Sequence, residues 1–205
     1  MGRLHDLYDS HGQSPWLDNL RRGWITSGEL QGWVDRGVRG LTSNPTIFAK
    51  AMTETNDYDR DLAALVAGGS SIAEAYWDLV VADIEQALAL LRPVHDASGG
   101  ADGYVSVEVN PALAHDESRT VEAVRELDDR IDAPNLYVKV PATAEGVHAI
   151  RTLIGEGRSI NVTLIFSLER YGEVMEAYLA GLEDNGGDDL SSISSVASFF
   201  VSRRS

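Results

Sequence analysis

Short apolar runs alternate with longer amphipathic stretches along most of the chain. The apolar runs predict strands, because they are rich in β-branched and aliphatic residues and are bounded by turn formers. The predicted strands cover Trp16–Leu20, Val38–Ser43, Tyr104–Val109, Leu136–Val140, Ile160–Ile165 and Val196–Val201. Strands and helices that alternate in this way, in repeats of about 30 residues, predict an α/β fold with parallel strands and right-handed crossovers.

The amphipathic stretches predict the helices between these strands. Thr26 and Glu29 have capping-box spacing, which predicts a helix through Trp33 and Val34. Ser71 is predicted to cap a long helix. The apolar face of that helix is expected to consist of Ile72, Ala75, Trp77, Val80, Val81, Ile84 and Leu88. Further helices are predicted over Glu117–Arg130, Ala144–Ile154 and Leu168–Leu182. The interval between the second and third strands is twice the usual length, so extra helices are expected there.

Length and composition narrow the class of protein. A chain of 205 residues with 43% hydrophobic and 24% charged residues is typical of a globular protein, and one domain is the simplest organisation. A net charge of −15 argues against a nucleic-acid or anionic-membrane partner. The chain has no cysteine, and its first residues lack the apolar core of a signal peptide, so the cytoplasm is the expected compartment.

Polar residues stand at or near the carboxyl end of every predicted strand. They are Asp18, Asn44, Glu108, Lys139, Asn161, Thr163 and Ser198. Ligands of parallel α/β folds bind at the carboxyl ends of the strands, so these side chains are expected to meet at one site. Residues two apart share a face of a strand, which groups Asn161 with Thr163 and Ser106 with Glu108.

Each of these residues also has a purely structural interpretation. Asn44-Pro45 and Asn110-Pro111 have the form of turn starts, because asparagine caps turns and helices. Lys139 could extend along apolar surface to water, or form a structural ion pair with a carboxylate of a neighbouring strand. Glu108 lies between two valines, where a carboxylate must be paired or functional.

Lys139 is the strongest chemical candidate. Burial favours the neutral form of an amine, which can attack a carbonyl, and the resulting iminium stabilises a carbanion at the adjacent carbon. The five histidines have no metal-ligand spacing, and the chain contains neither a phosphate-binding P-loop nor a dinucleotide-binding glycine fingerprint. The pattern therefore favours lysine-dependent carbon–carbon bond chemistry.

Six ordered motifs resemble the transaldolase family over essentially the whole chain. They are Q-S-P-W-L-D-N-L-R-R, G-L-T-S-N-P-T-I-F, V-S-V-E-V-N-P, Y-V-K-V-P-A-T, I-N-V-T-L-I-F-S and S-V-A-S-F-F-V-S-R. The resemblance implies a (β/α)₈ TIM barrel of class I aldolase type, a Schiff-base lysine, and no metal or organic cofactor. It also implies a transferase of the pentose phosphate pathway that moves dihydroxyacetone from fructose 6-phosphate or sedoheptulose 7-phosphate to an aldose phosphate.

The resemblance also implies a role for each site residue. Lys139 matches the Schiff-base lysine, and Asp18 matches the acid/base that takes the C4 hydroxyl proton during cleavage. Glu108 and Thr163 match the pair that holds the water used in proton shuttling. The remaining positions match groups that bind the substrate hydroxyls, at Asn44, Asn161 and Ser198, and its phosphate, at Arg203.

The match differs from the family at its end. Family members continue past V-S-R with two more strand–helix pairs, so residues 1–205 are expected to form a barrel domain of about six of the eight repeats. Edge strands left unpaired would favour self-association. Three alternatives stay open: a simple aldolase that releases free dihydroxyacetone, a non-catalytic binding or assembly module, and the N-terminal part of a transaldolase–isomerase fusion.

Overall fold

The computed structural model describes residues 2–199, which divide into two compact units. Within that range the first unit comprises residues 2–105 and 133–135, and the second comprises residues 106–132 and 136–199. The strand order in the sheet, β1-β2-β3-β4-β5-β6, follows the order in the chain, and the β1–β2, β4–β5 and β5–β6 pairs are parallel. The predicted α/β class with six strands is therefore confirmed.

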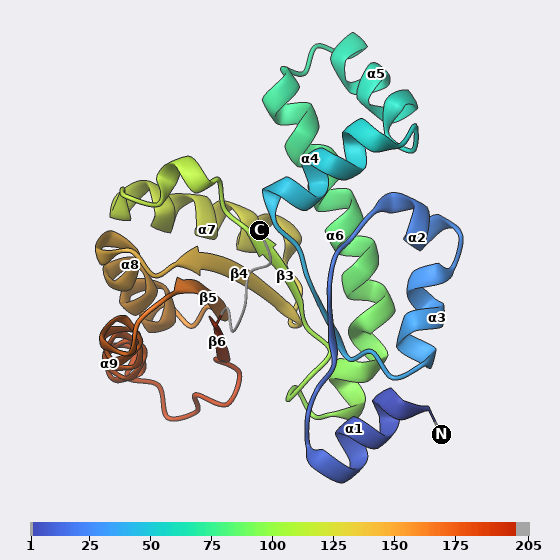
Figure 1. Cartoon of the computed structure of the whole chain (residues 1–205). Coiled ribbons are helices and arrows are strands. Elements are labelled where there is room, and N and C mark those ends of the chain that lie inside the picture. The colour runs from blue at the N-terminus through green and yellow to red at the C-terminus, as the bar shows by residue number, and fades with distance from the viewer. Residues whose placement is uncertain (1, 200–205) are drawn as a thin grey trace. The chain divides into compact units, whose positions relative to one another are not determined.

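The first unit is built around one long helix. Its elements are α1 (Arg3–His11), β1 (Trp16–Asp18), α2 (Arg22–Thr26), α3 (Glu29–Asp35), β2 (Gly40–Thr42), α4 (Pro45–Glu54), α5 (Asp59–Ala67) and α6 (Ile72–Ala97). α6 packs against α2, α3 and α5, as Figure 1 shows. The predicted Ser71 cap is confirmed as a full capping box, in which Ser71 accepts from the Glu74 N–H and the Glu74 carboxylate accepts from the Ser71 N–H.

Two predictions for the first unit are wrong in detail. Thr26 ends α2, where its hydroxyl bonds to the Arg22 carbonyl, so it does not cap the next helix. That helix begins after Gly28, whose left-handed φ of 77° is accessible to glycine at little cost. Ile72, the first residue of α6, is 68% exposed, so it lies off the buried face that begins at Ala75.

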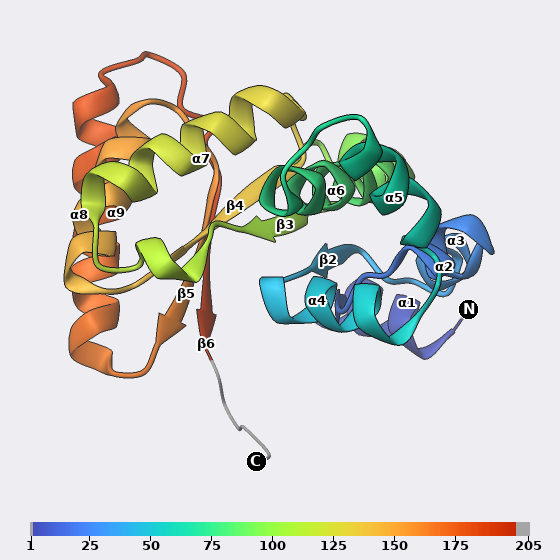
Figure 2. The ribbon, with the colours of Figure 1, turned by 90° about the horizontal axis from the view of Figure 1, so that it is seen from above.

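The second unit contains the other four strands. Its elements are β3 (Val105–Glu108), the 3₁₀ helix η1 (Pro111–Leu113), α7 (Glu117–Ile131), β4 (Leu136–Pro141), α8 (Ala144–Gly155), β5 (Ile160–Ile165), α9 (Leu168–Asn185) and β6 (Ser195–Phe199). Val105 at the start of β3 belongs to the first unit. α8 packs between α7 and α9, and these helices cover β4 and β5 (Figure 2). Every residue of β4 is buried, as expected for a strand of a covered parallel sheet.

No helix in the described part of the chain is both long and apolar enough to cross a membrane.

Candidate active site

Lys139 lies inside the buried strand β4, beside a carboxylate from β3. Its side chain is 9% exposed, and its Nζ lies 3.7 Å from Oε2 of Glu108, whose side chain is 13% exposed. This is an ion-pair distance, longer than a hydrogen bond. The β3–β4 neighbourhood thus brings together an amine and a group that can exchange protons with it. A carboxylate so close to the amine fits both a catalytic pair and the structural ion pair that the sequence left open.

Asn161 connects three strands of the second unit through its amide. It is the register partner of Lys139 across the β4–β5 pair, so the two side chains project from the same face. Its Nδ2 donates to Oγ of Ser106 in β3 at 2.9 Å, and its Oδ1 accepts from Oγ of Ser198 in β6 at 2.8 Å. Because β4 lies between β3 and β5, the bond to Ser106 passes over the face of β4 that carries the lysine. The structure therefore brings Lys139, Glu108, Asn161 and Ser198 together.

Ser106 was absent from the predicted site residues. It is fully buried, and its bond to Asn161 joins residues 55 positions apart in the chain. The available signal was its position two residues before Glu108, on the same face of the strand.

Thr163 is buried two residues after Asn161 and is the register partner of Pro141. Its carbonyl accepts from the Ala142 N–H at 2.8 Å. The next residue, Leu164, has a φ of 60°, and the β5–β6 register shifts between Val162 and Ile165. Irregularities of this kind re-aim side chains at strand ends. Thr163 thus lies on the lysine face at the point where the regular ladder stops.

The remaining described candidates belong to the first unit. Asp18 ends β1 as an exposed residue and is the register partner of Thr42. Asn44 caps α4, with its Oδ1 accepting from the Ile47 N–H at 3.0 Å, so the predicted turn-start role is confirmed for its oxygen. Asn110 likewise caps η1. The predicted phosphate ligand, Arg203, lies outside the described residues.

A cavity of about 260 Å³ adjoins Asp18. Its lining comes from the segment after β1 and from one side of α4, namely Asp18, Asn19, Arg21, Ile47, Lys50, Ala51, Glu54 and Thr55. Thr42, which the sequence did not single out, has a buried hydroxyl without a hydrogen-bond partner among the described residues. Thr42 is the register partner of Asp18 on the neighbouring strand, but it does not line this cavity.

No group of three or more histidine, aspartate or glutamate side chains within residues 2–199 is placed to hold a metal ion. The second unit thus offers a buried amine, an adjacent carboxylate and a set of hydroxyl and amide groups.

Comparison with known proteins identifies the family that the chain resembles. The family model described as transaldolase/fructose-6-phosphate aldolase matches residues 15–205. The chain is 52% identical over 203 residues to a transaldolase of Saccharopolyspora erythraea, and the match covers 98% of this chain and 55% of that protein. The identity and both coverages are the same for a transaldolase of Thermobifida fusca. For transaldolase 1 of Streptomyces coelicolor the identity is 51% over 205 residues, covering 98% of this chain and 54% of the relative. The chain thus spans about half the length of the curated relatives it matches.

Proposed function

The chain belongs to the transaldolase/fructose-6-phosphate aldolase family, and from that premise we propose that it transfers a dihydroxyacetone unit between sugar phosphates through a Schiff base on Lys139. The observation that carries the proposal is the buried amine of Lys139 beside the Glu108 carboxylate, in a strand that is otherwise apolar. Burying ionisable groups is costly, so a lysine paired with a carboxylate inside an apolar strand calls for a functional role.

The first half of the reaction takes place at the lysine. The amine of Lys139 attacks C2 of fructose 6-phosphate and forms a C–N bond, and a proton passes from the amine nitrogen to the carbonyl oxygen, which becomes a hydroxyl. Glu108 supplies a proton through water held with Thr163, the hydroxyl leaves as water, and an iminium remains. The iminium withdraws electrons from the neighbouring C3–C4 bond.

The second half moves the three-carbon unit. Asp18 takes the C4 hydroxyl proton, the C3–C4 bond breaks, and glyceraldehyde 3-phosphate leaves, while the bonding electrons enter the enamine on Lys139. The enamine carbon attacks the aldehyde of an acceptor aldose phosphate, and the aldehyde oxygen takes the proton back from Asp18. Water then hydrolyses the iminium and releases the product. These steps use the chain's own side chains and need no metal.

Substrate binding is assigned to the polar groups around the lysine and to the first unit. Asn161 and Ser198 bind substrate hydroxyls, as does Asn44 through its amide nitrogen. Arg203 binds the phosphate, for which a planar guanidinium is suited. The protein acts in the cytoplasm, in the pentose phosphate pathway.

Chemical trapping tests the proposal. Fructose 6-phosphate and borohydride should attach a dihydroxyacetone adduct to Lys139, and the Lys139→Ala variant should carry none. Glu108→Gln should slow imine formation, because it removes a proton donor, whereas Asp18→Asn should form the imine without cleaving the C3–C4 bond. Equal labelling of wild type and Lys139→Ala would refute the assignment of the lysine.

A simple aldolase is a second candidate, because the matching family model includes fructose-6-phosphate aldolase. Release of free dihydroxyacetone in the absence of an acceptor would favour it. Transfer to an added aldose phosphate without free dihydroxyacetone would favour the transaldolase. The non-catalytic module is less favoured, because relatives 52% identical to this chain are named transaldolase. The fusion stays a prediction.

Self-association through strand edges also stays a prediction. Light scattering over a range of concentrations tests it, and a monomer mass that does not change with concentration would contradict it.

A further inference from the structure

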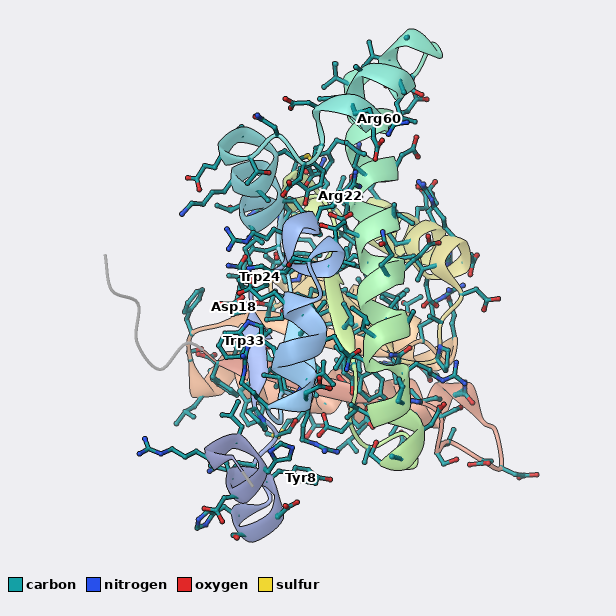
Figure 3. The ribbon with its side chains drawn as sticks, turned by 90° about the vertical axis from the view of Figure 1, so that its right-hand side faces the viewer. Tyr8, Asp18, Arg22, Trp24, Trp33 and Arg60 are labelled. Atoms are coloured by element: carbon teal, nitrogen blue, oxygen red, sulfur yellow. The ribbon has the colours of Figure 1, made fainter. Side chains whose placement is uncertain are left out.

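A buried hydrogen-bond cluster in the first unit joins α2, α6 and the segment between α4 and α5. Asp83 of α6 is fully buried, and Tyr58 is 1% exposed. Oδ1 of Asp83 accepts from Nε of Arg22 at 2.8 Å, and its Oδ2 accepts from the hydroxyl of Tyr58 at 2.7 Å. Arg22 also donates from Nη1 to Asp61 at 2.7 Å, and its guanidinium lies over the Tyr58 ring. Figure 3 labels Arg22 where α2 begins beside α6.

The phenol of Tyr58 is both a donor and an acceptor in this cluster. Burial, and next the charge of Asp83, raise the pKa of Tyr58 above its ordinary value, so the hydroxyl keeps its proton. That proton goes to Asp83, and the oxygen accepts from the backbone N–H of Arg22 at 3.0 Å. The first amides of a helix have no acceptor within the helix, and the residue before α2, Arg21, provides no side-chain cap. Tyr58 therefore caps α2 from 36 residues further along the chain.

Tyr58 also shares a core cluster with one wall of the cavity beside Asp18. One wall is the segment from Asp18 to Arg21, which leads directly into the capped Arg22. The other wall is α4, whose residue Ala51 shares a core cluster with Tyr58 and with Leu79 of α6. One side chain thus connects both walls of the cavity to the long helix α6.

We propose that Tyr58, oriented by Asp83, is a positioning residue that holds Asp18 and the adjoining cavity in the geometry needed for carbon–carbon cleavage. The proposal rests on the function proposed above, in which Asp18 takes the C4 hydroxyl proton and Lys139 forms the imine. Tyr58 touches no reacting atom, and its effect passes through the backbone of residues 19–22. Loss of its hydroxyl therefore impairs the step that uses Asp18 and spares imine formation, which depends on the second unit.

The experiment compares Tyr58→Phe with Tyr104→Phe. Tyr104 is also buried in the first unit, and its hydroxyl donates to the Gly100 carbonyl at 2.8 Å, so each variant loses one bonded phenol and keeps its ring. Imine is measured as borohydride-trapped adduct on Lys139, and cleavage as release of glyceraldehyde 3-phosphate. Tyr58→Phe should lower the cleavage rate by about 10- to 100-fold, as expected for a misplaced catalytic group, with imine unchanged. Tyr104→Phe should change neither quantity.

Equal cleavage rates in the two variants, or a parallel loss of imine and cleavage in Tyr58→Phe, would overturn the positioning role. Hydrogen exchange at the Arg22 amide supplies a readout that needs no turnover. The amide should exchange faster in Tyr58→Phe than in Tyr104→Phe at equal unfolding midpoints, and equal exchange would also overturn the proposal. If the wild type forms no imine, the proposed function fails, whereas the exchange result still decides whether Tyr58 holds this segment.

Discussion

Gly146 lies in the first turn of α8, where a side chain would collide with the end of the lysine strand. A Cβ added to Gly146 would lie 1.9 Å from the carbonyl oxygen of Pro141 and 2.9 Å from Oγ1 of Thr143. Pro141 is the last residue of β4, two positions after Lys139. The Gly146 N–H also donates to Thr143, the cap of α8, at 3.0 Å. Gly146→Ala must therefore displace the helix start or the strand end.

The expected change in the free energy of unfolding of Gly146→Ala is the difference between two opposing effects. Alanine in place of glycine inside a helix gains about 1 kcal/mol of stability. Overpacking costs about 1–3 kcal/mol and sometimes more. Because the obstacle is backbone rather than a flexible side chain, the upper end applies, and the free energy of unfolding should fall by about 2 kcal/mol. For a chain of this size that lowers Tm by roughly 4–8 °C.

A second helical glycine provides the matched control. A Cβ at Gly172, in α9, would meet nothing within 4 Å. Gly172→Ala should therefore raise the free energy of unfolding by about 0.4–1 kcal/mol, because it restricts the unfolded chain without a collision. Urea denaturation of both variants and the wild type measures the difference, expected to be about 3 kcal/mol. If Gly146→Ala were as stable as Gly172→Ala, α8 could not approach the Pro141 carbonyl at the end of β4 as closely as described.

Three further predictions concern single side chains. Ser71→Ala removes the cap of α6 and should lower the free energy of unfolding by about 1 kcal/mol in a denaturation experiment, and no loss would contradict the capping box. Asn161→Ala removes the amide that joins three strands and should lower the free energy of unfolding by about 1–3 kcal/mol. Urea denaturation measures this loss, and an unchanged unfolding midpoint would contradict the hydrogen bond to Ser106. Hydrogen bonds, first from Arg125, hold the pKa of Glu156 in the folded protein below its ordinary value. The ionised carboxylate therefore stabilises the fold above about pH 4.3, the pKa of an unperturbed glutamate. This stabilisation is lost as the pH falls through the lowered pKa of the folded state. Glu156→Gln should flatten the acid limb of the stability–pH curve, and a curve parallel to that of the wild type would refute this contribution.

Local patterns were sufficient for most of the secondary structure. The strand over Ile160–Ile165 and the cap at Ser71 were predicted at the residues where they occur, because strand alternation and capping chemistry depend on neighbours in the chain. Helices α1 and α2 were missed: α2 has only five residues, too few to show a helical period, whereas α1 has Leu4, Leu7 and Tyr8 at helical spacing, a signal that the prediction overlooked. The cap was misplaced at Thr26 because a capping box and the end of a short helix look alike in sequence.

The candidate site was predicted in part. Lys139 was conspicuous because one cation stood in an apolar strand, and that anomaly is visible without any structure. Ser106 was not conspicuous, because a serine in a strand becomes informative only when its hydrogen-bond partner, Asn161, is known.

The sequence by itself determined the order of the strands, most of the helices between them, the family motifs and the presence of a lysine where burial makes a charge costly. Only the tertiary structure decided which side chains meet: the amide of Asn161 between two serines, the phenol of Tyr58 at the start of α2, and the bare Cα of Gly146 against the Pro141 carbonyl. The physical reason is the distance along the chain over which each kind of interaction acts. Periodicity and capping act within a few residues, whereas these contacts join atoms that come together only when whole strands and helices pack, and no local pattern encodes their partners.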